Sequence, residues 1–266
     1  MIRRLQHEIK AWRDFGLDAL VLIAPEHAAP RSPRPGPEEQ EAAVPRRAPG
    51  PRPDQEDREV ERSVAIQPVL FDSQPTSSRD AEIASHELAK VVASCTRCKL
   101  HQGRTQTVFG EGPLGADLMF IGEGPGADED ATGRPFVGRA GQLLTKIIEA
   151  MGRRREDVYI ANVVKCRPPQ NRTPEPDEIG SCLPYLQEQI RLVRPRLICT
   201  LGAPATKTLL GITTSMSQAR GKIYKLGTIR VVPTFHPAYL LRNPAEKRKV
   251  WEDVQLINRL LAGNGG

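Results

Sequence analysis

From residue 82 onward, short apolar runs alternate with longer runs in which apolar residues recur at helical spacing. The short runs are typical of strands buried on both faces, and the longer runs are typical of helices that cover a sheet. The alternation predicts an α/β fold with three layers, α/β/α, around a central, mainly parallel, four-stranded sheet. The predicted strands are 116–121, 158–164, 196–201 and 229–232, and the predicted helices are 82–93, 141–151, 177–193, 204–210 and 245–261.

The residues before this domain differ from it in composition. Prolines crowd residues 25–79, which also carry mixed charges and few large apolar side chains. Such a segment buries too little apolar surface to offset the entropy lost on ordering, so we expect a disordered linker. Residues 1–24 predict an amphipathic helix, which either docks on the folded domain or binds a partner. The folded domain is expected over 80–262.

The chain is basic and shows no export or membrane segment. Its formal net charge is +6, from 38 Lys and Arg against 32 Asp and Glu, which suits a polyanionic partner. Charged residues interrupt the amino-terminal apolar positions, and no apolar run reaches the ~20 residues of a membrane span. We therefore expect a cytoplasmic, reducing location, where clustered cysteines bind metal more often than they form disulfides.

A glycine-rich stretch, 122–144, joins the first predicted strand to the next helix. In open α/β sheets such loops lie at the carboxyl ends of strands, where ligands bind, and glycine lets the backbone approach a ligand closely. Pro125 and the spacing Gly-x-Gly-x-Gly argue against a dinucleotide site, because proline has no N–H for a pyrophosphate. Asp128, Glu129 and Asp130 place carboxylates at the same mouth. The alternative is an ordinary tight loop with a solvated acidic edge.

Four of the five cysteines form a candidate metal site. Cys95 and Cys98 are spaced to reach one metal centre. Cys166 follows the second predicted strand, and Cys182 lies in the next helix. Four thiolates hold either a zinc ion or an iron–sulfur cluster; the alternative is a lone Cys-x-x-Cys beside two unrelated core thiols. Cys199, inside a predicted strand, is expected to be a buried core residue.

Three further side chains are expected near the glycine-rich loop. Asn162, near the end of the second predicted strand, offers one acceptor and two donors to the edge of a ligand. His236 follows the fourth predicted strand, a position that favours a role in binding or catalysis. Phe136 lies inside the loop, where it can stack on a flat ring. For Asn162 and His236 the alternative is a structural residue that ties down or caps a loop.

Four motifs, in chain order, carry a resemblance to a known family. They are Gly-Glu-Gly-Pro-Gly at 122–126, Gly-Arg-Pro-Phe-Val-Gly-Arg-Ala-Gly-Gln-Leu-Leu at 133–144, Asn-Val-Val-Lys-Cys-Arg-Pro-Pro-Gln-Asn-Arg at 162–172 and His-Pro-Ala-Tyr-Leu-Leu-Arg at 236–242. Together they resemble the family 4 uracil-DNA glycosylases, the iron–sulfur type, over about residues 82–261. The related DNA-crosslinking branch carries a basic, histidine-containing insert after the second motif, and its absence here implies turnover.

The resemblance implies roles for the matching residues. Phe136 matches the aromatic that stacks on uracil, Asn162 the amide that reads its edge, and His236 the histidine beside O2. The residues that match the family's uracil site are Gly122, Glu123, Gly124, Phe136, Asn162 and His236. The residues that match the ligands of a [4Fe–4S] cluster are Cys95, Cys98, Cys166 and Cys182.

The implied reaction hydrolyses the N-glycosidic bond of uracil and leaves an abasic site for base excision repair. Uracil inside a duplex is out of reach, so it is flipped into a pocket. His236 donates to O2 of the leaving base, and a carboxylate, Glu123 or Glu129 first among the candidates, orients water or favours the cationic sugar. The segment expected to fill the gap in the DNA and to meet phosphate is Tyr239, Leu240, Leu241 and Arg242.

Other basic side chains are candidates for contact with the DNA backbone. A non-enzymatic iron–sulfur or zinc module that binds nucleic acid is the rival interpretation. It accounts for the cysteines and the charge, but not for three candidate site residues at strand ends. We expect a monomer. The candidate backbone contacts are Lys165, Arg167, Arg172, Arg220, Lys222 and 247–249.

One apolar island interrupts the predicted linker. Gln67, Leu70 and Phe71 follow the pattern Gln-x-x-Leu-Phe, which resembles the short peptide by which bacterial repair and replication proteins bind the sliding clamp. The glutamine would hydrogen-bond in one pocket while the two apolar side chains fill another. The alternative is that this island packs back on the glycosylase domain.

Overall fold

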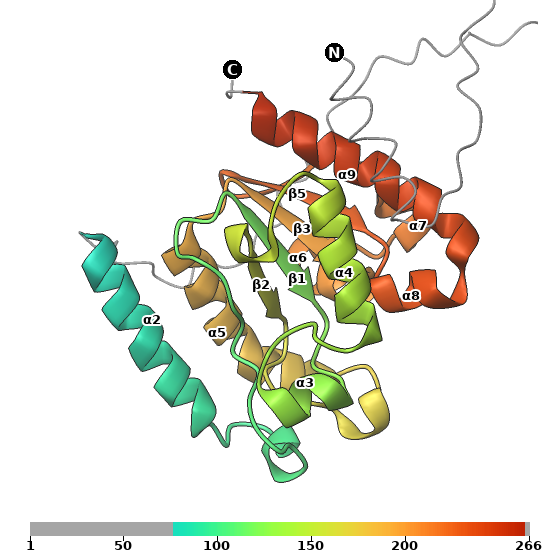
Figure 1. Cartoon of the computed structure of the whole chain (residues 1–266). Helices are drawn as coiled ribbons and strands as arrows, with labels where there is room; N and C mark the ends of the chain where they lie inside the picture. Colours follow the sequence, from blue (N-terminus) through green and yellow to red (C-terminus); the bar gives the residue numbers. More distant parts are fainter. Residues whose placement is uncertain (1–76, 264–266) are drawn as a thin grey trace, which may run out of the picture.

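The computed structural model describes residues 77–263 (Figure 1). Its centre is a five-stranded sheet with the strand order β2-β1-β3-β5-β4. The first three strands in this order and β5 run parallel, and β4 pairs antiparallel with β5. The strands are β1 (Leu118–Gly122), β2 (Tyr159–Asn162), β3 (Leu197–Leu201), β4 (Tyr224–Leu226) and β5 (Ile229–Thr234).

The prediction of a mainly parallel α/β sheet is confirmed, but the predicted number of strands, four, is wrong because the sheet has five. The missed strand, β4, has only 3 residues and is not fully buried at any of them. Gly227, with φ +60°, helps the chain to turn from β4 into β5. Such a short edge strand lacks the continuous apolar run that marks a central strand.

Each helix predicted within the folded domain is present, with small shifts at its ends. The short helices α3, α7 and α8 were not predicted, because one or two turns give too little periodic pattern to recognise. Residues 245–246, predicted as the start of the last helix, belong instead to a separate 3-10 turn, Pro244–Glu246. The α-helices are α2 (Ser78–Ala93), α3 (Ala127–Thr132), α4 (Arg139–Ala150), α5 (Pro176–Val193), α6 (Ala203–Leu210), α7 (Met216–Ala219), α8 (Pro237–Arg242) and α9 (Lys247–Ala262).

Alternate residues of β1 enter two separate cores, one on each face of the sheet. Leu118 and Phe120 pack with residues of α4 and α9. Met119 and Ile121 pack with residues of α2, α5 and α6. Side chains alternate along a strand, so the continuous apolar run reflects a sheet covered on both faces. Figure 1 shows α4 and α9 on one side of the sheet and α2 and α5 on the other.

The parallel strands bring their carboxyl ends to one edge of the sheet. Gly122, the last residue of β1, pairs in register with Asn162, the last residue of β2. Leu201, at the end of β3, pairs with Thr234, at the end of β5. The loops that leave these ends carry the predicted site residues, as expected for an open α/β sheet.

Most of the predicted amino-terminal organisation lies outside the described residues. This applies to the helix over 1–24, to the clamp-like peptide and to nearly all of the linker over 25–79. The last residues of that linker instead begin the domain, because the Ser77 side chain accepts a hydrogen bond from the N–H of Asp80 and caps α2. None of the described helices is long and apolar enough to cross a membrane.

Candidate active site and cysteine site

A wide cleft lies at the carboxyl ends of β1, β2 and β5. Its volume is about 1690 Å³, including the part open to solvent. The loop after β1, the end of β2, the loop before α5 and the start of α8 form its walls. The predicted site residues that line it are Glu123, Gly124, Glu129, Phe136, Asn162, His236, Tyr239, Leu241 and Arg242.

Gly122 supports two of the residues that line this cleft. A Cβ atom at position 122 would lie 2.4 Å from Oδ1 of Asn162 and 2.5 Å from Cζ of Phe136. Contacts this short do not occur, so any side chain at this position would displace the amide or the ring. Glycine at the end of β1 therefore lets these two groups lie close together.

The side chain of Asn162 is buried and holds an unused acceptor. The residue is 1% exposed, and its Oδ1 has no hydrogen-bond partner among the described residues. A buried polar atom left unpaired costs about 1–3 kcal/mol, so such atoms are rare in folded proteins. An unpaired acceptor at the wall of the cleft is available to an N–H of a ligand.

The backbone of Phe136 is held in an uncommon conformation. Its φ is +51°, in the left-handed region that residues other than glycine seldom adopt. Gly141 provides the space, because a Cβ atom there would lie 1.9 Å from the carbonyl carbon and oxygen of Phe136. Arg155 donates hydrogen bonds to the carbonyl oxygens of Pro135 and Phe136 and forms an ion pair with Glu111. These contacts fix the aromatic ring at the wall of the cleft.

His236 follows β5 and caps α8. Its Nδ1 accepts a hydrogen bond from the N–H of Ala238 at 3.1 Å, so the neutral ring carries its proton on Nε2. Burial, assisted by Arg242, lowers the pKa of His236 to about 4, while Glu129 opposes this shift. The centroid of the imidazole lies 5.6 Å from that of the Phe136 ring. The cleft therefore contains a neutral imidazole with an N–H donor at neutral pH.

The two candidate carboxylates differ in their surroundings. Glu129 accepts hydrogen bonds from the backbone N–H groups of Gly126, Val137 and Gly138, at 2.9 to 3.0 Å. It thereby ties the first turn of α3 to the residues that follow Phe136. Glu123 is half-buried at the wall of the cleft, and burial raises its pKa above the ordinary value.

Helix α8 presents only part of the segment that was expected to contact DNA. Leu241 is 45% exposed and Arg242 is exposed, whereas Tyr239 is half-buried and its ring lies 4.9 Å from that of Phe235. Leu240 is 0% exposed and belongs to the core beneath α4. Its predicted contact with DNA is wrong, because the helix turns adjacent side chains in different directions.

Two basic residues that were candidates for the DNA backbone point inward instead. Lys165 is 1% exposed, and its Nζ donates a hydrogen bond to the carbonyl oxygen of Asn162 at 2.8 Å. Arg220 is largely buried and pairs with the buried carboxylate of Asp253. The predicted contacts of Lys165 and Arg220 with the DNA backbone are therefore wrong. The sequence shows that a residue is basic, but it does not show whether the charged group is solvated or buried.

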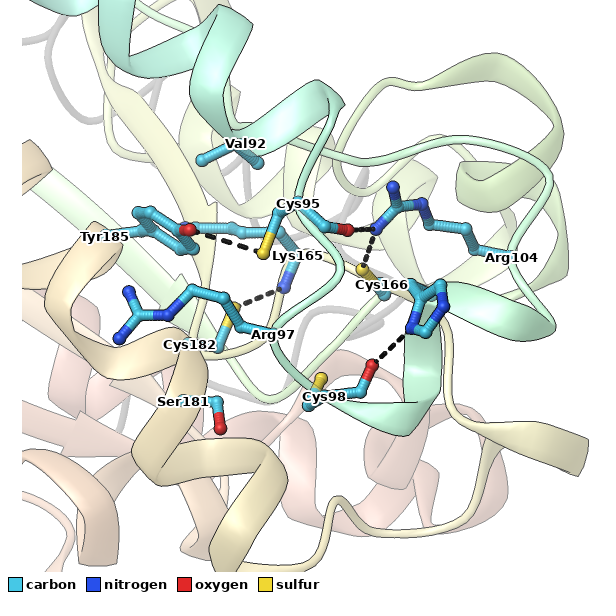
Figure 2. A pocket seen from close by; sticks show the side chains of 11 residues that line it. Val92, Cys95, Arg97, Cys98, Arg104, Lys165, Cys166, Ser181, Cys182 and Tyr185 are labelled. Carbon is cyan, nitrogen blue, oxygen red and sulfur yellow. Dashed lines mark hydrogen bonds between the residues drawn. The ribbon is translucent and has the colours of Figure 1, made fainter.

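The four predicted cluster cysteines line a second cavity, of about 290 Å³ including its open part (Figure 2). One wall comes from the turn after α2, another from the loop after β2, and a third from α5. Cys199, as predicted, is instead a buried core residue of β3. The cysteines around the cavity are Cys95, Cys98, Cys166 and Cys182.

Three of these four sulfur atoms accept hydrogen bonds from neighbouring residues. Burial raises the pKa of Cys182 to about 11, and a bound metal would replace the proton of this thiol. Within residues 77–263, no three His, Cys, Asp or Glu side chains converge as they do around a single metal ion. The hydrogen bonds to the three sulfur atoms run from Arg104 to Cys166 at 3.1 Å, from Tyr185 to Cys95 at 3.2 Å, and from the backbone N–H of Lys165 to Cys182 at 3.2 Å.

Comparison with known families identifies the superfamily of the chain. A family model described as the uracil DNA glycosylase superfamily matches residues 109–255, more than half of the chain. The matched residues include all five strands and most of the cleft. The chain belongs to this superfamily.

Similar curated proteins identify the branch. A type-4 uracil-DNA glycosylase from Thermotoga maritima is 49% identical over 188 residues, which cover 69% of this chain and 96% of the relative. Another, from Sulfurisphaera tokodaii, is 48% identical over 183 residues, covering 65% and 83%. A type-5 uracil-DNA glycosylase from Pyrobaculum aerophilum is 34% identical over 172 residues, covering 58% and 75%. The chain belongs to the type-4 uracil-DNA glycosylases, as its motifs predicted.

Proposed function

We propose that the cleft receives a uracil flipped out of DNA and that its residues hydrolyse the N-glycosidic bond, leaving an abasic site for base excision repair. The family assigns the enzyme class, a uracil-DNA glycosylase. One observation supports the finer assignment most strongly. The buried acceptor of Asn162, unpaired among the described residues, lines the same cleft as the Phe136 ring and the neutral His236.

Asn162 reads the base through complementary hydrogen bonds. Its Oδ1 accepts the N3–H of uracil and its Nδ2 donates to O4. Cytosine presents an acceptor at N3 and a donor at position 4, so both contacts would be lost. The buried amide would then remain unpaired, which penalises the wrong base. Phe136 supports one face of the ring by stacking.

Cleavage places negative charge on the base and positive charge on the sugar. The Nε2–H of His236 donates to O2 and stabilises the leaving anion, and the contact between Nδ1 and the N–H of Ala238 holds the ring in that tautomer. We assign Glu123 to the water or the cationic sugar. Glu129 serves as a positioning residue, because its oxygens already accept backbone N–H groups.

The pH dependence follows from this neutral histidine. Because the folded pKa is about 4, protonation of His236 should remove no activity between about pH 5 and pH 8. The unfolded histidine takes up its proton at higher pH than the folded one. The neutral ring's contribution to stability is therefore complete above the unfolded pKa and is lost as the pH falls through about 4. Single-turnover excision across this range checks the assignment, and a fall in rate centred near the ordinary histidine pKa contradicts it.

The function itself is tested with a uracil-containing oligonucleotide. After incubation, alkali cuts the strand at each abasic site, and gel electrophoresis counts the cuts. We expect cleavage at uracil and none at thymine or cytosine in matched strands. Hypoxanthine and mismatched strands define how broad the preference is. Binding of the uracil strand without any cleavage would favour the rival interpretation, a non-enzymatic nucleic-acid-binding module.

We infer that the second cavity binds an iron–sulfur cluster. Four cysteines surround one space, and four thiolates are a ligand set for such a cluster. The resemblance to the iron–sulfur type of glycosylase favours a cluster over zinc. When bound, a [4Fe–4S] cluster would cross-link α2, the loop after β2 and α5.

We expect the purified protein to be yellow-brown and to contain about four iron atoms per chain, because a [4Fe–4S] cluster holds four iron atoms. Visible absorbance and elemental analysis measure this directly. Protein prepared without air provides the reference for cluster loss. Zinc at one equivalent with no iron would contradict the cluster assignment.

At the rim of the cleft, we assign Leu241 to the gap left by the flipped base and Arg242 to a phosphate, because both side chains are exposed.

The clamp contact of Gln67, Leu70 and Phe71 is also proposed, from its motif alone. A peptide spanning 63–76 should bind the sliding clamp, and replacing both Leu70 and Phe71 with alanine should abolish binding without slowing excision on free oligonucleotides. A peptide that does not bind, or a double variant that destabilises the enzyme, contradicts this proposal.

A further inference from the structure

Lys165 is a buried cation between the two sites. Its ammonium donates hydrogen bonds to the carbonyl oxygen of Asn162 at 2.8 Å and to Oε1 of Gln189 at 2.5 Å. Gln189 is itself fixed, because its Nε2 donates to the carbonyl oxygen of Phe109 and to the hydroxyl of Tyr159. The ammonium is therefore held in one place by neutral acceptors.

No carboxylate balances this charge. Among the ion pairs of residues 77–263, none joins Lys165 to an aspartate or a glutamate. A buried charge without a counter-charge is strongly destabilising, yet Lys165 is 1% exposed. An anion near this residue would offset that cost.

The cysteine cavity is where that anion would lie. Lys165 lines the cavity, its backbone N–H donates to Sγ of Cys182, and Cys166 is the next residue (Figure 2). A cluster bound by four thiolates carries net negative charge, since each ligand binds as an anion. Among the described residues, the other charged groups that line the cavity are cations, Arg97 and Arg104, with His101 beside them. The surroundings therefore suit an anionic group.

We propose that Lys165 is the buried counter-ion of the cluster and that it positions Asn162, so that loading the cluster holds the base-reading amide in place. This rests on the cluster and on the role of Asn162 proposed above. The cluster's charge keeps the ammonium in the interior, and the ammonium anchors the backbone of Asn162 at the end of β2. Lys165 touches neither the base nor the reacting atoms.

The test compares Lys165→Met with Lys99→Met in the full chain. Methionine keeps most of the length of lysine and removes the charge. Lys99 follows Cys98 but is exposed and pairs with Glu175 at the surface, so its removal is the matched control. We expect Lys165→Met to lower the reduction potential of the cluster by at least about 59 mV. For a one-electron couple this is a tenfold change in the redox equilibrium constant. Release of iron to a chelator should be at least tenfold faster, and Lys99→Met should match the wild type.

Measurements of uracil excision distinguish two roles of Lys165: positioning Asn162, or affecting only the cluster through its charge. In Lys165→Met that retains its cluster, discrimination between uracil and cytosine should fall, because the amide is less firmly placed. Lys165→Arg should restore the potential by restoring the charge. An unchanged potential together with unchanged iron release in Lys165→Met would overturn the proposal. Neither the potential nor the iron release requires activity, so a failure of the proposed function would show separately, as a wild type that does not excise uracil.

If Lys165→Met does not fold, the wild type provides the test. Removing the cluster should increase hydrogen exchange at the end of β2 and in the residues up to Cys166, while β3 remains protected. Equal loss of protection in both strands, or none in either, would overturn the local link between the cluster and Asn162.

Discussion

Replacing His236 with alanine is expected to slow uracil excision by about 10²–10³-fold, the range found when one preorganised donor to a developing anion is removed. The donor is the Nε2–H, since Nδ1 is occupied by the N–H of Ala238. The loss should appear in the single-turnover rate rather than in binding of the uracil strand, because charge on O2 develops only as the bond breaks.

The controls separate catalysis from folding. Alanine also removes the cap of α8, which costs about 1 kcal/mol. His236→Asn supplies an oxygen that caps a helix but no Nε2–H, so it should lose activity while retaining more stability. His86→Ala, at an exposed position of α2, should leave excision unchanged. Wild-type rates in His236→Asn would contradict the assigned role.

Replacing Asn162 with aspartate is expected to abolish most uracil excision, by about 10⁴-fold, because a site built for specific hydrogen bonds strongly rejects a mismatched partner. The carboxylate cannot donate to O4 of uracil. It can instead accept from the exocyclic amine of cytosine, so activity on cytosine should rise above that of the wild type. Excision from matched uracil and cytosine strands measures both changes.

Asn171→Asp is the matched control, since Asn171 lines the same cleft but is exposed and accepts a hydrogen bond from Arg167. It should change neither rate by more than a few fold. Undiminished uracil excision in Asn162→Asp would show that the buried amide does not read the base.

The sequence reveals most of the layered fold because its signals are local. Continuous apolar runs mark β1, β2, β3 and β5, and the regular spacing of α4, α5 and α9 marks the covering layers. The carboxyl ends of parallel strands meet at one edge of the sheet, so the sequence alone predicts that Asn162 and His236 lie near each other. The edge strand β4 escaped notice because its three residues, two half-buried and one exposed, carry no comparable signal.

The supports of the site could not be predicted because they depend on contacts between distant residues. Arg155, 19 positions after Phe136, holds the carbonyl oxygen of that residue. Gly141 matters because the backbone of Phe136 passes against it. The three N–H groups that occupy Glu129 likewise come from both sides of the loop. A motif shows that these residues belong together, but only the packed loop shows what each one holds.

Burial separates residues that look alike in sequence. Leu240 and Leu241 are adjacent, yet one is in the core and the other is 45% exposed. Lys165 and Arg167 are both basic and two positions apart, but only Lys165 is enclosed, between Asn162 and the cysteine cavity. Which side chains of a short helix, or of a loop without a regular period, face the interior is set by tertiary packing.

The central claim is that the unpaired acceptor of Asn162 receives the N3–H of uracil. It is tested most directly with the unaltered enzyme, by comparing single-turnover excision of uracil and of N3-methyluracil placed in the same single-stranded oligonucleotide. The methyl group replaces the one hydrogen that Oδ1 would accept, while the single strand removes any difference in base pairing. We expect uracil to be excised and N3-methyluracil to be excised at least about 10³-fold more slowly. Equal rates for the two bases would contradict the assignment.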